Sequence, residues 1–419
     1  MKVLVLGAGV IGVTTAYVLG RQGHEVVVID KADEVASGAS HANAGQLSYS
    51  YVDPFPNPGI LAKLPDYILG RDNGIKINQN FSPHYYSWGL QFLRNCTPER
   101  AKKNLHTMLG FAHHSMVAMQ RLTDEISDDL TANNSRSKLI LAITDAELEK
   151  YEKSAAQKQQ FGFDVEILSR EECIDKEPAL KTWQGTFCGG LYAKKEQTID
   201  PQKFCNLLKK KSAKQFGIEF KLGHSILSLT VKNNKISGIV TDHGSFDCDM
   251  VVMCLGVGTN EILKTIGKSS NIYPMRGYSL TLPLGACPPK VSITDPLSKI
   301  VIANFGDKIR IAGFLDANIS KDQIQQRGEI LLQTAKKLLP EAANYDADNN
   351  LWAGYRPMTP SGVPIVKPSS VDGLYYNMGH GSLGLTLAAG SAERIAKLVW
   401  QSTQKSRTKR LEEKHVLVS

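Results

Sequence analysis

The chain of 419 residues has few cysteines and lacks a long apolar run. Its seven cysteines are scattered, and no two have the CxxC spacing of zinc sites and redox motifs, so the sequence indicates neither a metal site nor a disulfide framework. We therefore expect a reduced, cytoplasmic protein. No run reaches the roughly 18 apolar residues of a membrane span, which predicts a protein that is soluble or at most attached to a surface.

The charge is modest for this length. A formal net charge of +8 is compatible with acidic substrates or anionic lipid surfaces and does not by itself indicate nucleic acid. The hydrophobic fraction of 42% and the charged fraction of 21% are those of a globular protein. The length exceeds one ordinary core, so we expect two domains, which can be interleaved.

The first thirty residues predict a compact βαβ unit. Residues 2–6 (KVLVL) form a short apolar run that ends in glycines, as a buried parallel strand does. Residues 10–22 have apolar residues at helical spacing, and residues 25–30 (EVVVID) predict a second buried strand.

The turn in this unit has the GxGxxG pattern of a dinucleotide site. Gly7 permits the tight turn, Gly9 lets the backbone approach a pyrophosphate, and Gly12 allows the helix to pack closely on the strand. The amino terminus of the helix offers amide donors to the phosphates, and Asp30 can accept both ribose hydroxyls of an adenosine. This motif alone does not distinguish FAD from NAD.

Residues 35–60 predict a long functional loop that is rich in small and polar residues. Within it, residues 37–46 (SGASHANAGQ) can bring backbone amides close to a phosphate or flavin, with polar contacts from Ser37, Ser40 and Asn43. From composition alone, a flexible surface loop is an equal alternative.

Two late segments carry candidate chemistry. In the turn-rich residues 354–360 (GYRPMTP), two prolines stiffen the backbone around Arg356, and a rigidly held guanidinium suits a carboxylate. A surface arginine in a turn is the alternative. Residues 379–384 (GHGSLG) precede a helix whose positive end would stabilise an anionic reduced flavin, and His380 there is either a base or, as we expect, a backbone-positioning residue.

The rest of the chain predicts further strands and helices. Tyr273, Arg276 and Tyr278 are expected to share one face of a strand at 272–282, where a tyrosine hydroxyl can close over a substrate; a sheet packing face is the alternative. Residues 246–254 predict one strand. The last helix is expected to end near residue 400, with a basic tail at 401–419.

Five segments together resemble the DAO-type family of flavoproteins, and within it the bacterial D-amino acid dehydrogenases. They are GAGVIG with Asp30, SGASHANAGQLS, YPMRGYSLTL, GYRPMTPSGVPIV and NMGHGSLGLTLAAG. The similarity runs from residue 1 to about residue 400, and the paired late motifs are much more specific than the glycine turn. The segment 49–80 and the basic tail are not diagnostic of that group, so the side-chain preference stays open.

The resemblance implies non-covalent FAD and an α/β fold, in which a Rossmann-like FAD-binding domain is interleaved with a substrate domain built on a mixed sheet. The FAD-binding domain would comprise residues 1–48, 195–262 and 350–400, and the substrate or cap domain residues 49–194 and 263–349.

The resemblance also implies roles for single residues. Arg356 would grip the substrate carboxylate, Tyr278 is a candidate for a lid over the substrate, and His380 is a third candidate catalytic residue. The expected cofactor contacts are Gly7, Gly9, Val10, Ile11, Gly12, Asp30, Lys31, Ser37, Ser40, Asn43, Ala44, Gly45, Gln46, Gly256, Gly379, Gly381, Ser382, Leu383 and Gly384.

The activity implied is oxidative deamination of a D-amino acid to a 2-oxo acid and ammonia, by hydride transfer from Cα to flavin N5. Glycine, sarcosine-like amines and D-hydroxyproline are alternative substrates. An NAD-dependent dehydrogenase and a non-enzymatic flavin-binding protein are rival classes.

The resembling group passes electrons to a quinone in the bacterial inner membrane, which implies a peripheral membrane protein; oxygen is the alternative acceptor. Residues 60–69 (ILAKLPDYIL), with Lys63 and Arg71 beside them, are a candidate docking element. A helix that packs on its own core is at least as good an explanation of this stretch. A homo-oligomer is also left open.

Overall fold

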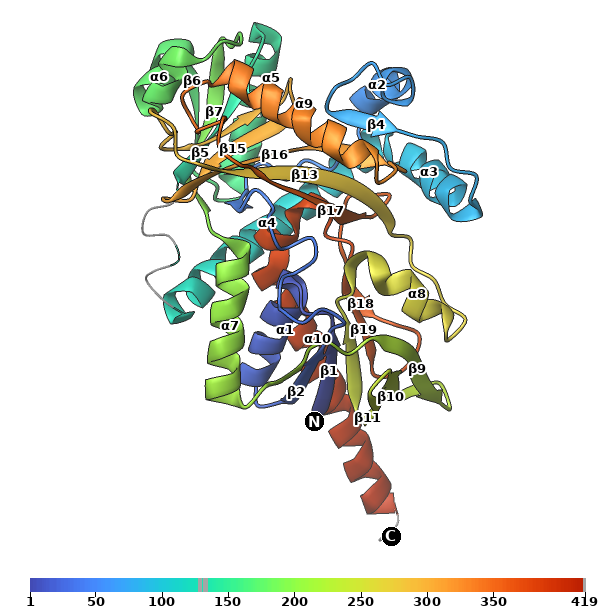
Figure 1. Ribbon diagram of the computed structural model, residues 1–419. Helices are drawn as coiled ribbons and strands as arrows, with labels where there is room; N and C mark the ends of the chain where they lie inside the picture. The colour runs from blue at the N-terminus through green and yellow to red at the C-terminus, as the bar shows by residue number, and fades with distance from the viewer. Residues whose placement is uncertain (127–129, 131–134, 417–419) are drawn as a thin grey trace.

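The computed structural model describes residues 1–126, 130 and 135–416, with side chains through residue 404 (Figure 1). A six-stranded sheet lies in the lower half of Figure 1, and a ten-stranded sheet crosses the upper half. This mixed α/β architecture confirms the predicted fold class.

The six-stranded sheet is built around the predicted βαβ unit. Its strand order is β18-β19-β12-β1-β2-β8, and every pairing is parallel except that of β18 with β19. The strands are β1 (Lys2–Leu6), β2 (Glu25–Ile29), β8 (Glu219–Lys221), β12 (Met250–Met253), β18 (Ile365–Pro368) and β19 (Leu374–Met378).

Both faces of this sheet are buried, which explains its continuous apolar strands. Val3 and Val5 face a layer of helices, whereas Leu4 and Leu6 pack toward a small antiparallel sheet. The helices are α1 (Val10–Arg21), α4 (Pro98–Ile126), α7 (Pro201–Phe216) and α10 (Gly384–Val416). The small sheet comprises β9 (Ile226–Lys232), β10 (Lys235–Thr241) and β11 (Gly244–Asp247), with α8 (Thr259–Lys264) beside it.

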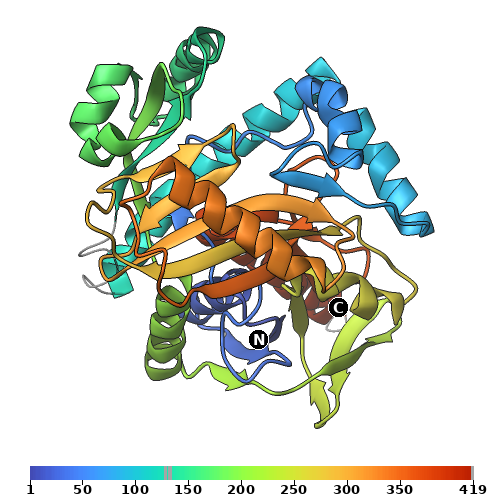
Figure 2. The same cartoon turned by 45° about the horizontal axis from the view of Figure 1, so that its top comes forward.

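The ten-stranded sheet is mixed, as expected. Its main path is β17-β13-β16-β15-β14-β5-β7-β3, with β4 beside β16 and β6 beside β7. The strands are β3 (Gln46–Leu47), β4 (Ile75–Ile77), β5 (Arg136–Ala142), β6 (Val165–Ser169), β7 (Gly189–Thr198), β13 (Tyr273–Pro283), β14 (Ser292–Asp295), β15 (Ile300–Asn304), β16 (Lys308–Ala317) and β17 (Asn350–Met358). Helix α9 (Gln323–Leu338) lies across one face (Figure 2).

Side-chain alternation divides the two faces of this sheet. Along four strands, one residue enters the core under α9 and its neighbour lines a cavity on the opposite face. The core residues are Leu139, Ile293, Ile302 and Ile311, and the neighbours that line the cavity are Lys138, Thr294, Val301 and Ala312. The cavity therefore lies on the face of the sheet that α9 does not cover.

The remaining helices extend from the ten-stranded sheet at two corners (Figure 2). At one corner, α2 (Pro58–Ile68) and α3 (Pro83–Asn95) surround an aromatic cluster that includes Trp88, Phe92 and Tyr273. At the other lie α5 (Asp145–Gln160) and α6 (Arg170–Lys176).

Three sequence predictions about local structure are wrong. Residues 246–254 belong to two strands, because β11 pairs antiparallel with β10 while β12 joins β1 in the six-stranded sheet. The last helix continues to Val416, since residues 401–416 contain no glycine or proline that would end it. Arg356 lies on strand β17 rather than in a turn; β17 is an edge strand, where Pro357 is tolerated.

The chain passes repeatedly between the two large sheets. Strands β1 and β2 lie in the six-stranded sheet and β3 in the ten-stranded one, whereas late in the chain β17 lies in the ten-stranded sheet and β18 and β19 in the six-stranded one. The two expected domains are interleaved in this sense, and their residue boundaries stay a prediction.

Candidate active site

The glycine turn between β1 and α1 is packed too tightly for side chains at two of its positions. Gly7 has a φ of +107°, and a Cβ there would lie 2.6 Å from the carbonyl oxygen of Cys254. A Cβ on Gly12 would lie 1.7 Å from the carbonyl oxygen of Gly7. Both glycines therefore hold the helix against the strand, as the sequence predicts.

Gly9 differs from its two neighbours, because its Cβ position is almost open. The nearest protein atom within 4 Å is Oγ of Ser40, at 3.5 Å. Gly9 is the N-cap of α1 and has no side chain of its own to cap the helix, while the Val10 amide donates to Ser40 Oγ at 3.0 Å. A helix amino terminus beside open space favours an anion, which fits a pyrophosphate.

Asp30 follows β2 and lies beside this turn. Its carboxylate accepts hydrogen bonds from the amides of Ala8, at 2.6 Å, and Ala32, at 2.9 Å. The acid thus fixes the turn, and each carboxylate oxygen keeps a further lone pair for a ribose hydroxyl. Together with the open position at Gly9, this donor and acceptor set fits the ADP half of FAD.

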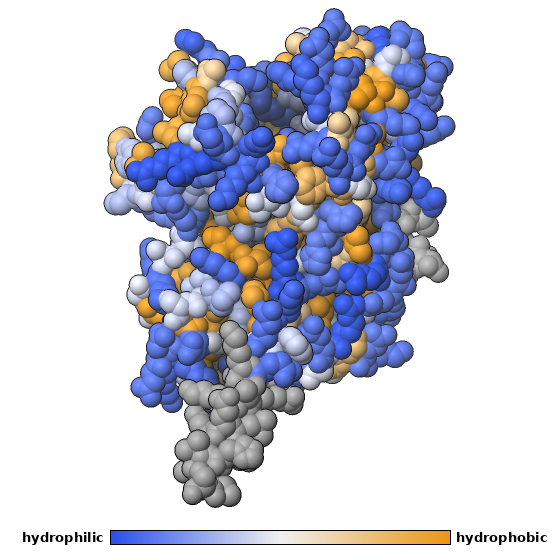
Figure 3. Space-filling view, turned by 180° about the vertical axis from the view of Figure 1, so that it is seen from behind, coloured by the Kyte–Doolittle hydropathy of each residue, from blue (hydrophilic) through white to orange (hydrophobic). Residues whose placement is uncertain are grey.

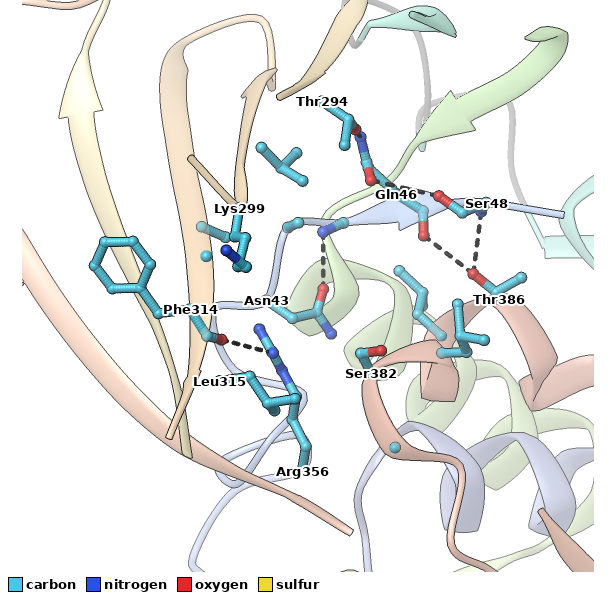
Figure 4. Close-up of a pocket in the computed structure, with 18 of the residues that line it drawn as sticks. Asn43, Gln46, Ser48, Thr294, Lys299, Phe314, Leu315, Arg356, Ser382 and Thr386 are labelled. Atoms are coloured by element: carbon cyan, nitrogen blue, oxygen red, sulfur yellow. Dashed lines mark hydrogen bonds between the residues drawn. The ribbon is translucent and has the colours of Figure 1, made fainter. Parts of the chain in front are cut away.

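A cavity of about 330 Å³ lies beyond this site, between the open face of the ten-stranded sheet and the start of α10. Its lining comes from the segment around β3, from the ten-stranded sheet including its edge strand β17, and from the glycine turn and first residues of α10. Figure 4 labels ten of the lining residues, Asn43, Gln46, Ser48, Thr294, Lys299, Phe314, Leu315, Arg356, Ser382 and Thr386.

The loop before β3 is anchored from both sides of the cavity. Asn43 accepts the Gly45 amide at 2.8 Å through its side chain and the Arg310 guanidinium at 3.0 Å through its carbonyl oxygen. Thr386, in the first turn of α10, accepts the Ser48 amide and donates to the carbonyl oxygen of Gln46 (Figure 4). This loop is therefore a fixed wall of the cavity and not a flexible surface loop.

Arg356 is a cation without an acidic partner in this cavity. Among the described residues its guanidinium makes one hydrogen bond, from Nη1 to the carbonyl oxygen of Phe314 at 2.8 Å, and no carboxylate lies within ion-pair distance (Figure 4). Burial lowers the pKa of Arg356 to about 10, so the group stays charged at neutral pH. Its unused N–H donors suit a bidentate carboxylate ligand.

The neighbouring strand positions this guanidinium. Gly277 on β13 pairs with Gly354 on β17, and a Cβ on Gly277 would lie 2.6 Å from Cζ of Arg356. Behind it, the buried Asp316 is held by Arg327 through two hydrogen bonds of 2.7 and 3.0 Å. Asp316 is thus paired elsewhere, which leaves Arg356 free for a ligand.

Tyr278 also lines the cavity, but its ring is buried in the core under α9. Burial, followed by the nearby Asp316 carboxylate, raises the pKa of its hydroxyl. Tyr273 packs instead with Trp88 and Phe92 in the separate aromatic cluster. The prediction that Tyr273 and Tyr278 share one face is wrong, since five positions separate them and a strand alternates with a period of two.

The turn before α10 contributes Gly381, Ser382 and Leu383 to the cavity, whereas His380 does not line it. Burial lowers the pKa of His380 to about 3, so its imidazole is neutral at physiological pH and a weak base. Its carbonyl oxygen accepts the Leu383 amide at 3.0 Å. The backbone of His380 shapes the turn.

The other expected cofactor contacts fall into two groups. Ala44, Gly45 and Gln46 line the cavity. Residues outside the cavity lining are Ile11, which is half-buried on α1, the exposed Lys31 and Ser37, Gly256 after β12, Gly379 beside Thr359, and Gly384 at the start of α10.

Lys138, Lys299 and Thr294 line the cavity and were missed by the sequence analysis. Lys138 is buried and donates to Ser48 Oγ at 2.6 Å, and burial lowers its pKa to about 8. The signal in the sequence was a lysine that directly precedes the apolar run LILA, since a lysine is seldom fully buried.

Residues 2–398 match the sequence profile of the FAD dependent oxidoreductase (DAO) family. The chain belongs to that family. This finding confirms the expected family, the oxidoreductase class and the FAD cofactor, and it favours neither a NAD-dependent dehydrogenase nor a non-enzymatic protein.

Relatives and solved structures of this family cover nearly the whole chain. The chain is 34% identical to D-amino acid dehydrogenase 2 of Ralstonia nicotianae, over 95% of this chain and 96% of the relative. It is 36% identical to a D-amino acid dehydrogenase of Allorhizobium ampelinum, over 95% and 94%. Glycine oxidase from Bacillus cereus has the same fold, with a TM-score of 0.70, 20% identity and coverage of 96% and 95%.

Proposed function

We propose that this FAD-dependent oxidoreductase oxidises D-amino acids to 2-oxo acids and ammonia. The observation that carries the proposal is Arg356, a charged guanidinium in the cavity that has, among the described residues, one backbone partner and no acidic one. Relatives at 34 and 36% identity over nearly the full chain are D-amino acid dehydrogenases, and they support the same substrate class. Oxidation of glycine, sarcosine-like amines or D-hydroxyproline is the alternative.

The substrate carboxylate binds Arg356, which fixes one end of the amino acid in the cavity. The nearby Tyr278 and Phe314 limit how the rest of the substrate can turn. His380 does not line the cavity and burial keeps its imidazole neutral, so His380 is not the base of the reaction. No strong base is required when the substrate amine binds in its neutral form. Catalysis then rests on orientation, and water converts the resulting imino acid to the 2-oxo acid and ammonia.

FAD, when bound, supplies the acceptor of the hydride from Cα. The residues that fit its ADP half are Gly9, Val10, Ser40 and Asp30, since they combine a helix amino terminus beside open space with an acid beside the turn. The flavin half fits the wall formed by Asn43–Gln46 and the turn Gly381–Leu383, where the positive end of α10 favours negative charge. Discontinuous segments 1–48, 195–262 and 350–400 would form this FAD-binding domain.

We further propose that a quinone or another acceptor, rather than oxygen, receives the two electrons. The dehydrogenase relatives favour this assignment. Within the described residues, no helix is long and apolar enough to cross a membrane. We propose a cytoplasmic enzyme held at the surface of the inner membrane, and a homo-oligomer remains a secondary proposal.

Turnover of purified protein with D-alanine and a soluble redox dye tests this function. We expect dye reduction with equal amounts of 2-oxo acid and ammonia, and little hydrogen peroxide without dye. L-Alanine is the matched control substrate. Peroxide formation at the rate of dye reduction would identify an oxidase, and preference for glycine or sarcosine would replace the proposed substrate.

A further inference from the structure

The exposed apolar side chains of the molecule are concentrated at one corner. Fifteen large hydrophobic residues are exposed in the part of the chain with described side chains, and seven of them lie between residues 61 and 93. Scattered exposed apolar residues are ordinary, but a concentration of this kind marks an interaction surface. We call these seven the α2–α3 face: Leu61, Ile68, Leu69, Phe81, Tyr86, Leu90 and Leu93.

Helix α2 carries two apolar stripes instead of one. Its inner stripe, with Ile60 and Tyr67, packs into the aromatic cluster. Leu61, Pro65 and Ile68 repeat the same i, i+4, i+7 spacing one residue later and are exposed. Packing on its own core explains the first stripe and leaves the second without a partner among the described residues.

Helix α3 has the same construction. Trp88 and Phe92 are buried in the aromatic cluster, while Tyr86, Leu90 and Leu93 are exposed at i, i+4, i+7 spacing. In the segment between the two helices, Phe81 is 83% exposed. Packing on the core therefore explains one stripe of residues 60–69, and the other stripe remains on the surface.

The charge around this face is positive. Residues 58–103 contain seven lysines and arginines and three acidic residues, and one of the acids, Asp72, is paired with Lys299 at 2.6 Å. Figure 3 shows orange side chains among blue ones at its upper left, where α2 and α3 lie. A second copy of the chain would bring the same positive charge, whereas an anionic lipid surface complements it.

We propose that the α2–α3 face docks on an anionic lipid bilayer. The leucines, Ile68 and Phe81 enter the boundary between headgroups and acyl chains, and the basic side chains contact the headgroup phosphates. Attachment of this kind needs no membrane-spanning helix.

The same corner borders the cavity, which gives the docking a functional consequence. Lys299 lines the cavity, pairs with Asp72 and lies 5.9 Å from the ring of Tyr67 on α2. Ile75, on β4 just after α2, also lines the cavity. If the proposed dehydrogenase activity holds, docking brings a lipid-soluble acceptor close to the site of substrate oxidation.

Flotation with vesicles of phosphatidylethanolamine and phosphatidylglycerol tests the docking on the purified holoenzyme. We expect the wild type to bind, and added salt or vesicles of phosphatidylcholine alone to weaken binding. The variant Leu61→Glu/Leu90→Glu should bind on the order of 100-fold more weakly, because it lacks two leucines that enter the bilayer in the proposed complex. The matched control is Leu227→Glu/Leu297→Glu, which changes two equally exposed leucines elsewhere and should bind like the wild type.

Bound FAD and dye-linked turnover of each variant separate docking from folding and from catalysis. Normal turnover with lost vesicle binding supports the proposal, and Phe81→Ser gives a second test if the double variant loses FAD. Wild-type protein that does not bind vesicles, or equal binding by all variants, would overturn the docking surface and leave the proposed enzyme intact. A dimer that Leu61→Glu/Leu90→Glu dissociates would assign the face to a second copy instead.

Discussion

The glycine turn and the cavity recognise their ligands by different means. The turn uses backbone amides and space: Gly7, Gly9 and Gly12 lie within six residues, and Asp30 closes the site. The cavity uses side chains from strands far apart in sequence, including Arg356 and Lys138. The glycine turn therefore depends on the absence of side chains at its glycines, whereas the cavity depends on the position of one charged side chain, Arg356.

Removing the cavity's charge should have the largest effect. Arg356→Ala should remove about 3–5 kcal/mol of transition-state stabilisation and so lower kcat/KM for a D-amino acid about 150- to 5,000-fold, while FAD stays bound. Stopped-flow reduction of the flavin and dye-linked kinetics measure the loss. Arg356→Lys should recover part of it, because it restores charge without the planar fork. Wild-type kinetics in Arg356→Ala would remove Arg356 from the substrate site.

Two glycine substitutions should separate folding from cofactor binding. Gly12→Ala places a Cβ 1.7 Å from a carbonyl oxygen and should prevent recovery of folded protein. Gly9→Ala meets only Ser40 Oγ at 3.5 Å, so it should fold and bind FAD at least about tenfold more weakly, because its Cβ enters the phosphate site. Thermal melts and FAD titration measure the two effects. Equal behaviour of both variants would contradict the distinction.

Gly277→Ala tests how the charge is held. Its Cβ would lie 2.6 Å from the Arg356 guanidinium, so the arginine must move. We expect KM to rise about tenfold with FAD binding unchanged, as measured by steady-state kinetics and flavin absorbance. Gly89→Ala is the control, since a Cβ there meets nothing within 4 Å. An unchanged KM in Gly277→Ala would show that the position of Arg356 is not critical.

The last prediction concerns His380 and acid stability. Burial lowers its pKa from the ordinary 6.5 to about 3, so between these pH values the unfolded chain binds a proton that the folded chain does not. This contribution to stability is present above pH 6.5 and is lost as the pH falls, by about 2 kcal/mol between pH 7 and pH 5. Denaturant melts of His380→Gln should lack this slope, while the exposed His243→Gln should keep it. The same slope in both variants would contradict the assignment.

The sequence predicted the glycine turn better than it predicted the cavity. The glycine turn and Asp30 are set by short-range backbone geometry, and the structure has both in the expected elements. The two prolines singled out Arg356 and the family resemblance gave its role, but its place on an edge strand was not predicted, because two prolines in a short segment indicate a turn.

Lys138, Lys299 and Asp316 were missed for a different reason. Each lies on or beside a strand whose pairing partners are distant in sequence, and only the ten-stranded sheet brings them together. The second apolar stripes of α2 and α3 were also hidden, since a sequence pattern does not show which of two stripes the core covers. Both the cavity lining and the exposed stripes depend on contacts between segments that are distant in the sequence.

Anaerobic mixing of the purified protein with D-alanine tests the central claim most directly. The bound flavin of the wild type should lose its absorbance near roughly 450 nm, L-alanine should leave it unchanged, and Arg356→Ala should bleach several hundred-fold more slowly. A flavin that D-amino acids do not bleach, or that L-alanine bleaches equally well, would contradict the account.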